Sequence, residues 1–317
     1  MIDYDEFSLF GENIEEFGLA REMPTVARVE TEVHDTDGGS RVVSALRWGT
    51  SSPELVFVHG GAQNAHTWDT VALCSDRPAL AIDLPGHGHS GWRDDGAYSP
   101  IGMADDLALV IAAHAPDARV VVGMSLGGLT AMELAARHPD LVRALVMVDI
   151  TPGVNSAKTK AVTDFVDGPQ SFASFDDLLR RTMEFNPTRS ESSLRRGILH
   201  NARRLDDGSW QWRYDRGSHA RARIGESSEP AAPADETLPA EDTPLSPLWD
   251  DFASIRCPLL LVRGSLSPVV DDDDVAEARR CLPDITVEVV DGAGHSVQGD
   301  RPVELASLIA AWLEAQS

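Results

Sequence analysis

The 317-residue chain has a hydrophobic share of 42%, a charged share of 25% and a formal net charge of −24. This composition is typical of a globular protein, and the negative charge excludes a nucleic-acid partner because phosphate binding needs a basic surface. No apolar run approaches the roughly 20 residues that cross a bilayer, so we expect no membrane partner. The acidic start and three sparse cysteines, which have no metal-ligand spacing, predict a cytoplasmic protein without a structural metal.

The amino-terminal part of the chain predicts a β-hairpin. Residues 28–33 and 41–48 alternate between apolar and polar side chains, and Asp37-Gly38-Gly39 stands between them. The sheet is therefore expected to begin with antiparallel strands.

Short runs of almost wholly apolar residues follow, which is typical of strands buried on both faces. They are Leu55–Val58, Ala79–Ile82, Val120–Val122, Leu145–Val148, Leu259–Val262 and Val287–Val290. Helical patterns separate several of them, at residues 103–113, 275–281 and 303–313. This alternation predicts an α/β fold with a mostly parallel sheet and helices on both faces.

The alternation stops between Ile150 and Ile255. Within that stretch, residues 172–185 and 192–205 predict helices, and residues 210–214 predict a short strand. Residues 225–248 hold five prolines, six acidic residues and no basic residue, so we expect a linker there.

A Gly-x-Ser-x-Gly sequence lies between the run at Val120–Val122 and a helix expected from Leu129. Its central residue, Ser125, would sit on a sharp strand-to-helix turn that flanking glycines make sterically possible. Such a turn exposes the serine hydroxyl at the positive end of a helix. We therefore predict that Ser125 is a nucleophile.

Two glycine loops provide the other groups that a serine nucleophile needs. His59-Gly60-Gly61 predicts a tight loop in which the Gly61 amide, together with the Leu126 amide, forms an oxyanion hole. We expect His59 itself to be structural. His295, in a glycine loop after the last strand, is the predicted general base, because a serine hydroxyl is a poor nucleophile without one.

Taken together, these motifs resemble the α/β-hydrolase fold superfamily, in a member with a serine nucleophile and an inserted cap domain. The resemblance is carried by residues 59–62, 83–88, 123–128 and 292–295. It implies an eight-stranded sheet and a cap inserted after strand six. The expected division is a core at 1–151 and 256–317 and a cap at 152–255, which includes the linker. The cap's aromatic residues either line a cavity or form its own core.

The acid of the expected triad departs from the family pattern. Most members carry it on the loop after the seventh strand, where this chain has Ser267, and a serine cannot supply the charge that stabilises an imidazolium. Asp149, at the end of the sixth strand, lies on the ligand side of a parallel sheet and is the favoured replacement. Asp271 is the alternative acid, although acids at 271–274 also suit the start of a helix. A dyad or a damaged triad is the remaining possibility.

The predicted function is hydrolysis of a small ester, lactone or thioester through an acyl-enzyme, with a small-molecule substrate and with no cofactor or metal. One alternative keeps the triad for perhydrolysis, carbon–carbon bond hydrolysis or a lyase reaction. The other is a non-catalytic ligand-binding protein of the same fold, which Ser267 in the usual acid position keeps open.

Overall fold

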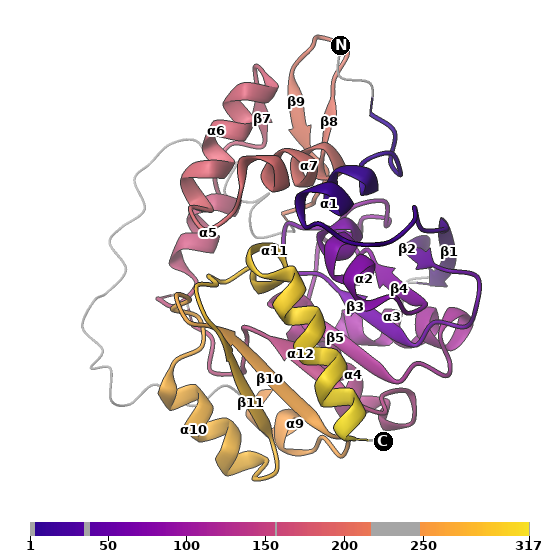
Figure 1. Ribbon diagram of the computed structural model, residues 1–317, viewed down its shortest axis with the longest axis vertical. Helices are drawn as coiled ribbons and strands as arrows, with labels where there is room; N and C mark the ends of the chain where they lie inside the picture. The colour runs from indigo at the N-terminus through magenta and orange to yellow at the C-terminus, as the bar shows by residue number, and fades with distance from the viewer. Residues whose placement is uncertain (1–3, 35–38, 156, 217–247, 317) are drawn as a thin grey trace.

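The computed structural model describes residues 4–34, 39–155, 157–216 and 248–316. Figure 1 shows an eight-stranded sheet at its centre, with the strand order β1-β2-β4-β3-β5-β6-β10-β11. Strand β2 is antiparallel to β1 and β4, and all the other neighbours are parallel. The strands are β1 (Val26–His34), β2 (Ser40–Trp48), β3 (Leu55–Val58), β4 (Ala79–Ile82), β5 (Val120–Met124), β6 (Leu145–Val148), β10 (Leu259–Gly264) and β11 (Thr286–Val290).

The expected α/β class and mostly parallel sheet are confirmed. Every residue of β3, β4, β5 and β6 is buried, which explains why these segments are apolar without alternation. The hairpin of β1 and β2 also forms, while Asp37 and Gly38 of its expected turn lie outside the described residues.

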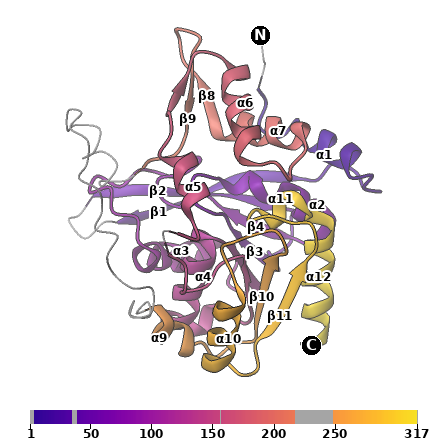
Figure 2. The ribbon, with the colours of Figure 1, turned by 90° about the vertical axis from the view of Figure 1, so that its left-hand side faces the viewer.

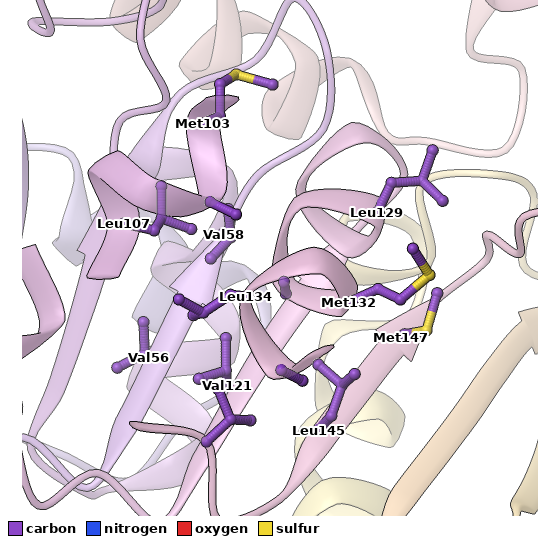
Figure 3. Packing of buried hydrophobic residues seen from close by; sticks show 14 of the residues in the cluster. Val56, Val58, Met103, Leu107, Val121, Leu129, Met132, Leu134, Leu145 and Met147 are labelled. Atoms are coloured by element: carbon purple, nitrogen blue, oxygen red, sulfur yellow. The ribbon is translucent and has the colours of Figure 1, made fainter. Parts of the chain in front are cut away.

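Helices cover both faces of the sheet and bury a separate apolar cluster on each. One face carries α3 (Pro100–His114), α4 (Leu126–Arg137), α9 (Leu248–Ala253) and α10 (Asp272–Cys281). The other carries α1 (Phe10–Glu16), α2 (Asp69–Ser75), α11 (Val297–Asp300) and α12 (Pro302–Ala315). Short 3₁₀ turns occur at η1 (Ala65–Trp68) and η2 (Pro139–Leu141). Figure 3 shows the first cluster, where Val56, Val121 and Leu145 of the sheet pack beneath α4.

A second group of elements lies between β6 and β10 in the chain. Figures 1 and 2 show it stacked on one end of the sheet. It consists of α5 (Lys160–Val166), β7 (Ser171–Phe172), α6 (Phe175–Phe185), α7 (Glu191–Asn201), β8 (Ala202–Arg204) and β9 (Trp210–Trp212). Its strands form a small sheet of order β7-β9-β8. We call this group the cap elements.

Two boundaries in this region differ from the sequence expectation. The helix expected at 192–205 ends at Asn201, because Ala202 adopts an extended backbone and pairs with Trp212. Helix α9 falls inside the expected cap range, yet Trp249 and Phe252 pack into the core cluster beneath α4. Residues 225–247 of the expected linker lie outside the described residues. Within the described ranges, no helix is both long and apolar enough to cross a membrane.

The amino-terminal segment joins the cap elements to the sheet. On α1, Glu12 lies 3.2 Å from the Arg195 guanidinium of α7, and Glu16 accepts a hydrogen bond from Arg196. Upstream, the Tyr4 hydroxyl lies 2.8 Å from Nδ1 of His200. Arg195 and Arg196 of α7 are therefore held by acids of the amino-terminal segment.

One buried acid on α4 gives a pH-dependent prediction. Glu133 is 1% exposed, and its burial, with the nearby Asp251 carboxylate, raises its pKa to about 7. Because this pKa lies above the unfolded value, the contribution of Glu133 to stability is present at low pH and is lost as the pH rises through 7. We expect Glu133→Gln to raise Tm at pH 8 by about 2–4 °C, which corresponds to about 1 kcal/mol, and to change it little at pH 5.

Thermal unfolding monitored by circular dichroism at the two pH values tests this expectation. Asp140→Asn is the matched control, because Asp140 is an exposed acid just beyond the end of the same helix. Equal shifts of Tm at both pH values in the Glu133→Gln protein would show that its carboxylate is not destabilising.

Candidate active site

Ser125 stands on the turn between β5 and α4. Its backbone angles are φ 52° and ψ −121°. Residues other than glycine rarely adopt these angles, because they carry a cost in backbone strain. The turn requires the flanking glycines: a Cβ on Gly123 would lie 2.3 Å from the carbonyl oxygen of Gly127, and one on Gly127 would lie 2.3 Å from that of His59. The glycine pattern therefore follows from close backbone approaches that hold Ser125 in position.

His295 and Asp149 complete a chain of hydrogen bonds with this serine. The Ser125 hydroxyl lies 3.1 Å from Nε2 of His295, and Nδ1 of the same ring lies 2.7 Å from Oδ2 of Asp149. The three residues come from the ends of β5 and β6 and from the loop after β11. The imidazole can thus accept the hydroxyl proton while the carboxylate fixes the ring orientation and its tautomer.

Asp149 is fully buried, and the loop after β10 surrounds it. The Gly264 amide donates to its Oδ1 at 3.0 Å, and the Ser267 hydroxyl donates to its Oδ2. Buried carboxylates need such partners, because an unpaired charge in the interior is costly. Ser267, which stands where the family resemblance led us to expect the acid, therefore contacts the carboxylate that follows the neighbouring strand.

The alternative acid, Asp271, lies elsewhere. It caps α10, where its side chain accepts from the Asp274 amide at 2.9 Å and forms a reciprocal capping box with that residue. It also pairs with Lys158 at 2.8 Å. The structure brings Asp149, rather than Asp271, to the histidine.

The contact with Ser267 leads to a testable effect. In Ser267→Ala, Asp149 loses a donor to its charged oxygen, a type of hydrogen bond worth about 1.5–3 kcal/mol. Because the carboxylate keeps the Gly264 amide and His295, only part of that loss should reach the transition state. We expect kcat/KM for p-nitrophenyl acetate to fall roughly tenfold.

Ser265→Ala is the control for this substitution, since Ser265 lies on the same loop but contacts Asp291 and Gly292. Its kcat/KM should stay within about twofold of wild type, because surface changes of this kind cost little. Equal losses in the two variants would assign the effect to the loop as a whole.

The predicted oxyanion amides lie beside the serine. A Cβ built on Gly61 would lie 3.9 Å from that of Leu126, and one on Gly60 would lie 3.2 Å from that of Ser125. Within the described part of the chain, the amides of Gly61 and Leu126 donate to no other group. Both amides are therefore available to a substrate oxygen.

His59 holds this loop rather than taking part in proton transfer. Its Nδ1 donates to the Gly60 carbonyl at 2.7 Å, and its Nε2 accepts from the Leu84 amide at 2.9 Å. Burial, with a smaller contribution from His87, lowers the pKa of His59 to about 3, so the ring is neutral. This agrees with its predicted structural role.

A cavity of about 440 Å³ opens over Ser125 and His295. Its floor includes Gly61 and Met124, and its walls come from the cap elements and from the loop after β10. The apolar wall residues are Ala161, Val162, Phe165, Val166, Phe185, Pro187, Leu266, Pro268 and Val269. The space suits the apolar part of a small substrate. Polar side chains, among them Lys158, Asn186 and Asp300, also line it.

The aromatic residues of the cap elements divide between the two expected roles. Phe165 and Phe185 line the cavity. Trp210, Trp212 and Tyr214 are buried in a cluster formed mainly by the cap elements themselves. The periodic sequence pattern could not separate these roles, because both place an aromatic side chain on an apolar face.

Two contributors to the site were missed from the sequence. The sequence indicates Ser267 only as a serine in the usual acid position. It gives no signal for Lys158, which lines the cavity and pairs with Asp274 at 2.6 Å. Neither lies in a local motif with the residue it contacts, so only the folded chain reveals the pairings.

Comparisons with known proteins agree with this architecture. A family model described as α/β hydrolase fold matches residues 53–302. The esterase Rv0045c of Mycobacterium tuberculosis is 43% identical over 319 residues, covering 98% of this chain and 97% of that esterase. A solved structure of it, described as "Transition metal inhibition and structural refinement", superimposes with a TM-score of 0.80 at 42% identity, covering 98% of this chain and 99% of that one.

A more distant relative is the 2-(acetamidomethylene)succinate hydrolase of Mesorhizobium japonicum. It is 28% identical over 278 residues, covering 87% of this chain and 93% of that enzyme.

Proposed function

Because this chain belongs to the α/β hydrolase fold family, we propose that it cleaves a small ester through an acyl-enzyme formed on Ser125. That the chain is an ester hydrolase follows from its 43% identity, over almost its whole length, to an esterase. The observation that carries the mechanism is the unbroken chain of hydrogen bonds from Ser125 through His295 to Asp149.

The first half of the reaction forms the acyl-enzyme. His295 takes the Ser125 proton as the oxygen attacks the substrate carbonyl, and Asp149 stabilises the imidazolium. The Gly61 and Leu126 amides would bind the oxyanion of the tetrahedral intermediate. Collapse of that intermediate releases the alcohol, which takes its proton from His295.

In the second half, a water molecule replaces the alcohol. His295 removes a proton from this water as it attacks the acyl carbonyl, and the second intermediate then releases the acid and the Ser125 hydroxyl. These steps involve only groups of this chain, the substrate and water.

The choice of a small ester rests on the cavity. Its volume of about 440 Å³ lies at the lower end of the range for small-molecule sites, and its walls are largely apolar. Thioesters and lactones are handled by the same chemistry and belong to the proposal. The non-catalytic alternative relied on the serine at position 267, and it loses this support because Asp149 lies 2.7 Å from His295.

We also propose that the insertion expected at residues 152–255 acts as a cap through the cap elements, which shape this cavity, while α9 at its end belongs to the core. The three free cysteines support a cytoplasmic location, which is part of the proposal. We further propose that transition metals inhibit this protein, because the description of the solved structure of the 42% identical esterase mentions transition metal inhibition.

A serine-reactive fluorophosphonate tests the nucleophile directly. After treatment and digestion, mass spectrometry should find one adduct, on the peptide that contains residue 125. A stoichiometric adduct on another serine, with residue 125 unmodified, would reject Ser125 as the nucleophile.

A further inference from the structure

A buried group of metal-ligand side chains lies outside the catalytic site. In the described ranges, His66, Asp69 and His200 form the one group of three or more such residues whose donor atoms all lie within 4.8 Å of one another. Nδ1 of His66 lies 2.9 Å from Oδ2 of Asp69, and Nε2 of His200 lies 3.7 Å from the same oxygen. His66 and Asp69 come from η1 and the start of α2, whereas His200 comes from α7.

One atom of this group lacks a partner. Nε2 of His200 is buried and makes no hydrogen bond with any described residue, and the whole side chain is 2% exposed. A buried polar atom without a partner carries a free-energy cost, and a role in binding an ion is one of the standard explanations for it.

The second nitrogen of each histidine ring contacts an oxygen atom, as is common for histidines that bind a metal. Nε2 of His66 lies 3.1 Å from Oε1 of Glu6, and Nδ1 of His200 lies 2.8 Å from the Tyr4 hydroxyl. A histidine that binds a metal usually hydrogen-bonds a carboxylate or another oxygen through its second nitrogen, which fixes the ring. The His200 ring therefore presents an unpartnered nitrogen to Asp69. The His66 ring presents Nδ1, which hydrogen-bonds the Asp69 carboxylate at 2.9 Å and would have to give up its proton to bind an ion.

A second cavity gives access to this group. It has a volume of about 120 Å³ and is lined by His66, Asp69 and His200 among other residues. It shares Gln63 and Asn186 as lining residues with the catalytic cavity, so it lies next to the substrate space. An ion and a water ligand can be accommodated in such a volume.

We propose that His66 Nδ1, Asp69 Oδ2 and His200 Nε2 bind one divalent transition ion, with Zn²⁺ as the reference case. Two imidazoles and a carboxylate suit this class of metal, and a cavity water completes a tetrahedral set. The donor separations in such a set are about 3.3 Å for bonds of 2.0–2.1 Å. The two rings are stacked, with centroids 3.7 Å apart and an 8° angle between planes, so they must tilt toward the ion.

The proposed ion would act on catalysis through the residue next to His200. Asn201 donates to the Ala62 carbonyl at 2.6 Å, and Asn64 donates to Asn201 at 3.2 Å. Ala62 follows Gly61, one of the proposed oxyanion amides. Tilting of the His200 ring toward the ion would therefore move the contacts that position this loop, and we expect slower ester hydrolysis. Only this consequence rests on the proposed function, whereas the binding site does not.

Isothermal titration of the full chain with ZnCl₂ tests the site without any activity measurement. Wild type should bind one Zn²⁺ per chain. Both His200→Gln and Asp69→Asn should weaken binding at least about 100-fold, because loss of even an outer partner of a metal ligand costs 10–100-fold. His138→Gln, which alters a histidine bonded to Asp105 on the surface, should bind as wild type does.

The catalytic histidine is the competing site, so His295→Gln is titrated in parallel and should retain Zn²⁺ binding. Circular dichroism confirms that each variant is folded. Binding that is lost in His295→Gln but unchanged in folded His200→Gln and Asp69→Asn would overturn the proposal. So would a wild-type chain that binds no Zn²⁺.

Rates of ester hydrolysis with and without Zn²⁺ then test the consequence separately. Inhibition should be present in wild type and in His138→Gln, and should weaken in parallel with binding in His200→Gln. Binding at the site without inhibition would leave the metal site standing and reject the coupling through Asn201. Absence of hydrolysis at all metal concentrations, with Zn²⁺ still bound, would count against the proposed function alone.

Discussion

Replacing Ser125 with alanine is expected to lower kcat for ester hydrolysis by about 10⁶-fold, the loss that removal of the nucleophile causes in a serine protease. The physical reason is that no acyl-enzyme can form. The turn itself should survive, because alanine and serine have the same Cβ and the glycines on either side still allow the close backbone approaches.

Hydrolysis of p-nitrophenyl butyrate measures this effect, with enzyme concentrations high enough to detect the residual rate. Ser307→Ala, which removes an exposed hydroxyl that bonds the Val303 carbonyl on α12, should retain wild-type activity. A Ser125→Ala protein with more than a hundredth of wild-type activity would contradict the acyl-enzyme mechanism.

Asp149→Asn is expected to lower kcat by about 10⁴-fold, as the corresponding change does in a serine protease. The introduced asparagine would fit the same volume, but its amide favours the wrong tautomer of His295 and leaves the imidazolium without a countercharge. Substrate binding should change much less than kcat, because the cavity walls do not include Asp149.

Asp271→Asn is the informative control for this experiment. Asp271 was the alternative acid, and the structure gives it a helix cap and a pair with Lys158 instead. Its replacement should change stability little, because asparagine caps a helix start about as well as aspartate does, while kcat stays near wild type. A large fall in kcat for Asp271→Asn and a small one for Asp149→Asn would reverse the assignment.

The contrast between these two acids shows what the sequence could predict. Ser125 and His295 each lie in a short glycine-rich motif that is contiguous in the sequence, so both can be recognised from neighbouring residues alone. The buried strands can be recognised as short apolar runs. The acid depends on which loops meet in space. Asp149 and Ser267 lie 118 positions apart, and their contact arises because β6 and β10 are neighbours in the sheet.

Other features were beyond the sequence for the same physical reason. The end of α7 at Asn201 is set by pairing of Ala202 with Trp212, a tertiary contact that overrides local helix preference. His66, Asp69 and His200 come from three separate elements, and only His66 and Asp69 are close to each other in the sequence. A sequence pattern contains no signal for such a meeting point.

The position of Asp149 links the cap to proton transfer. Asp149 immediately follows β6, and the inserted region begins three residues later. The segment just before α5 is also tied to α10, because Lys158 pairs with Asp274 at 2.6 Å. The carboxylate that aligns His295 and the first residues of the insertion therefore belong to one short, continuous stretch of backbone.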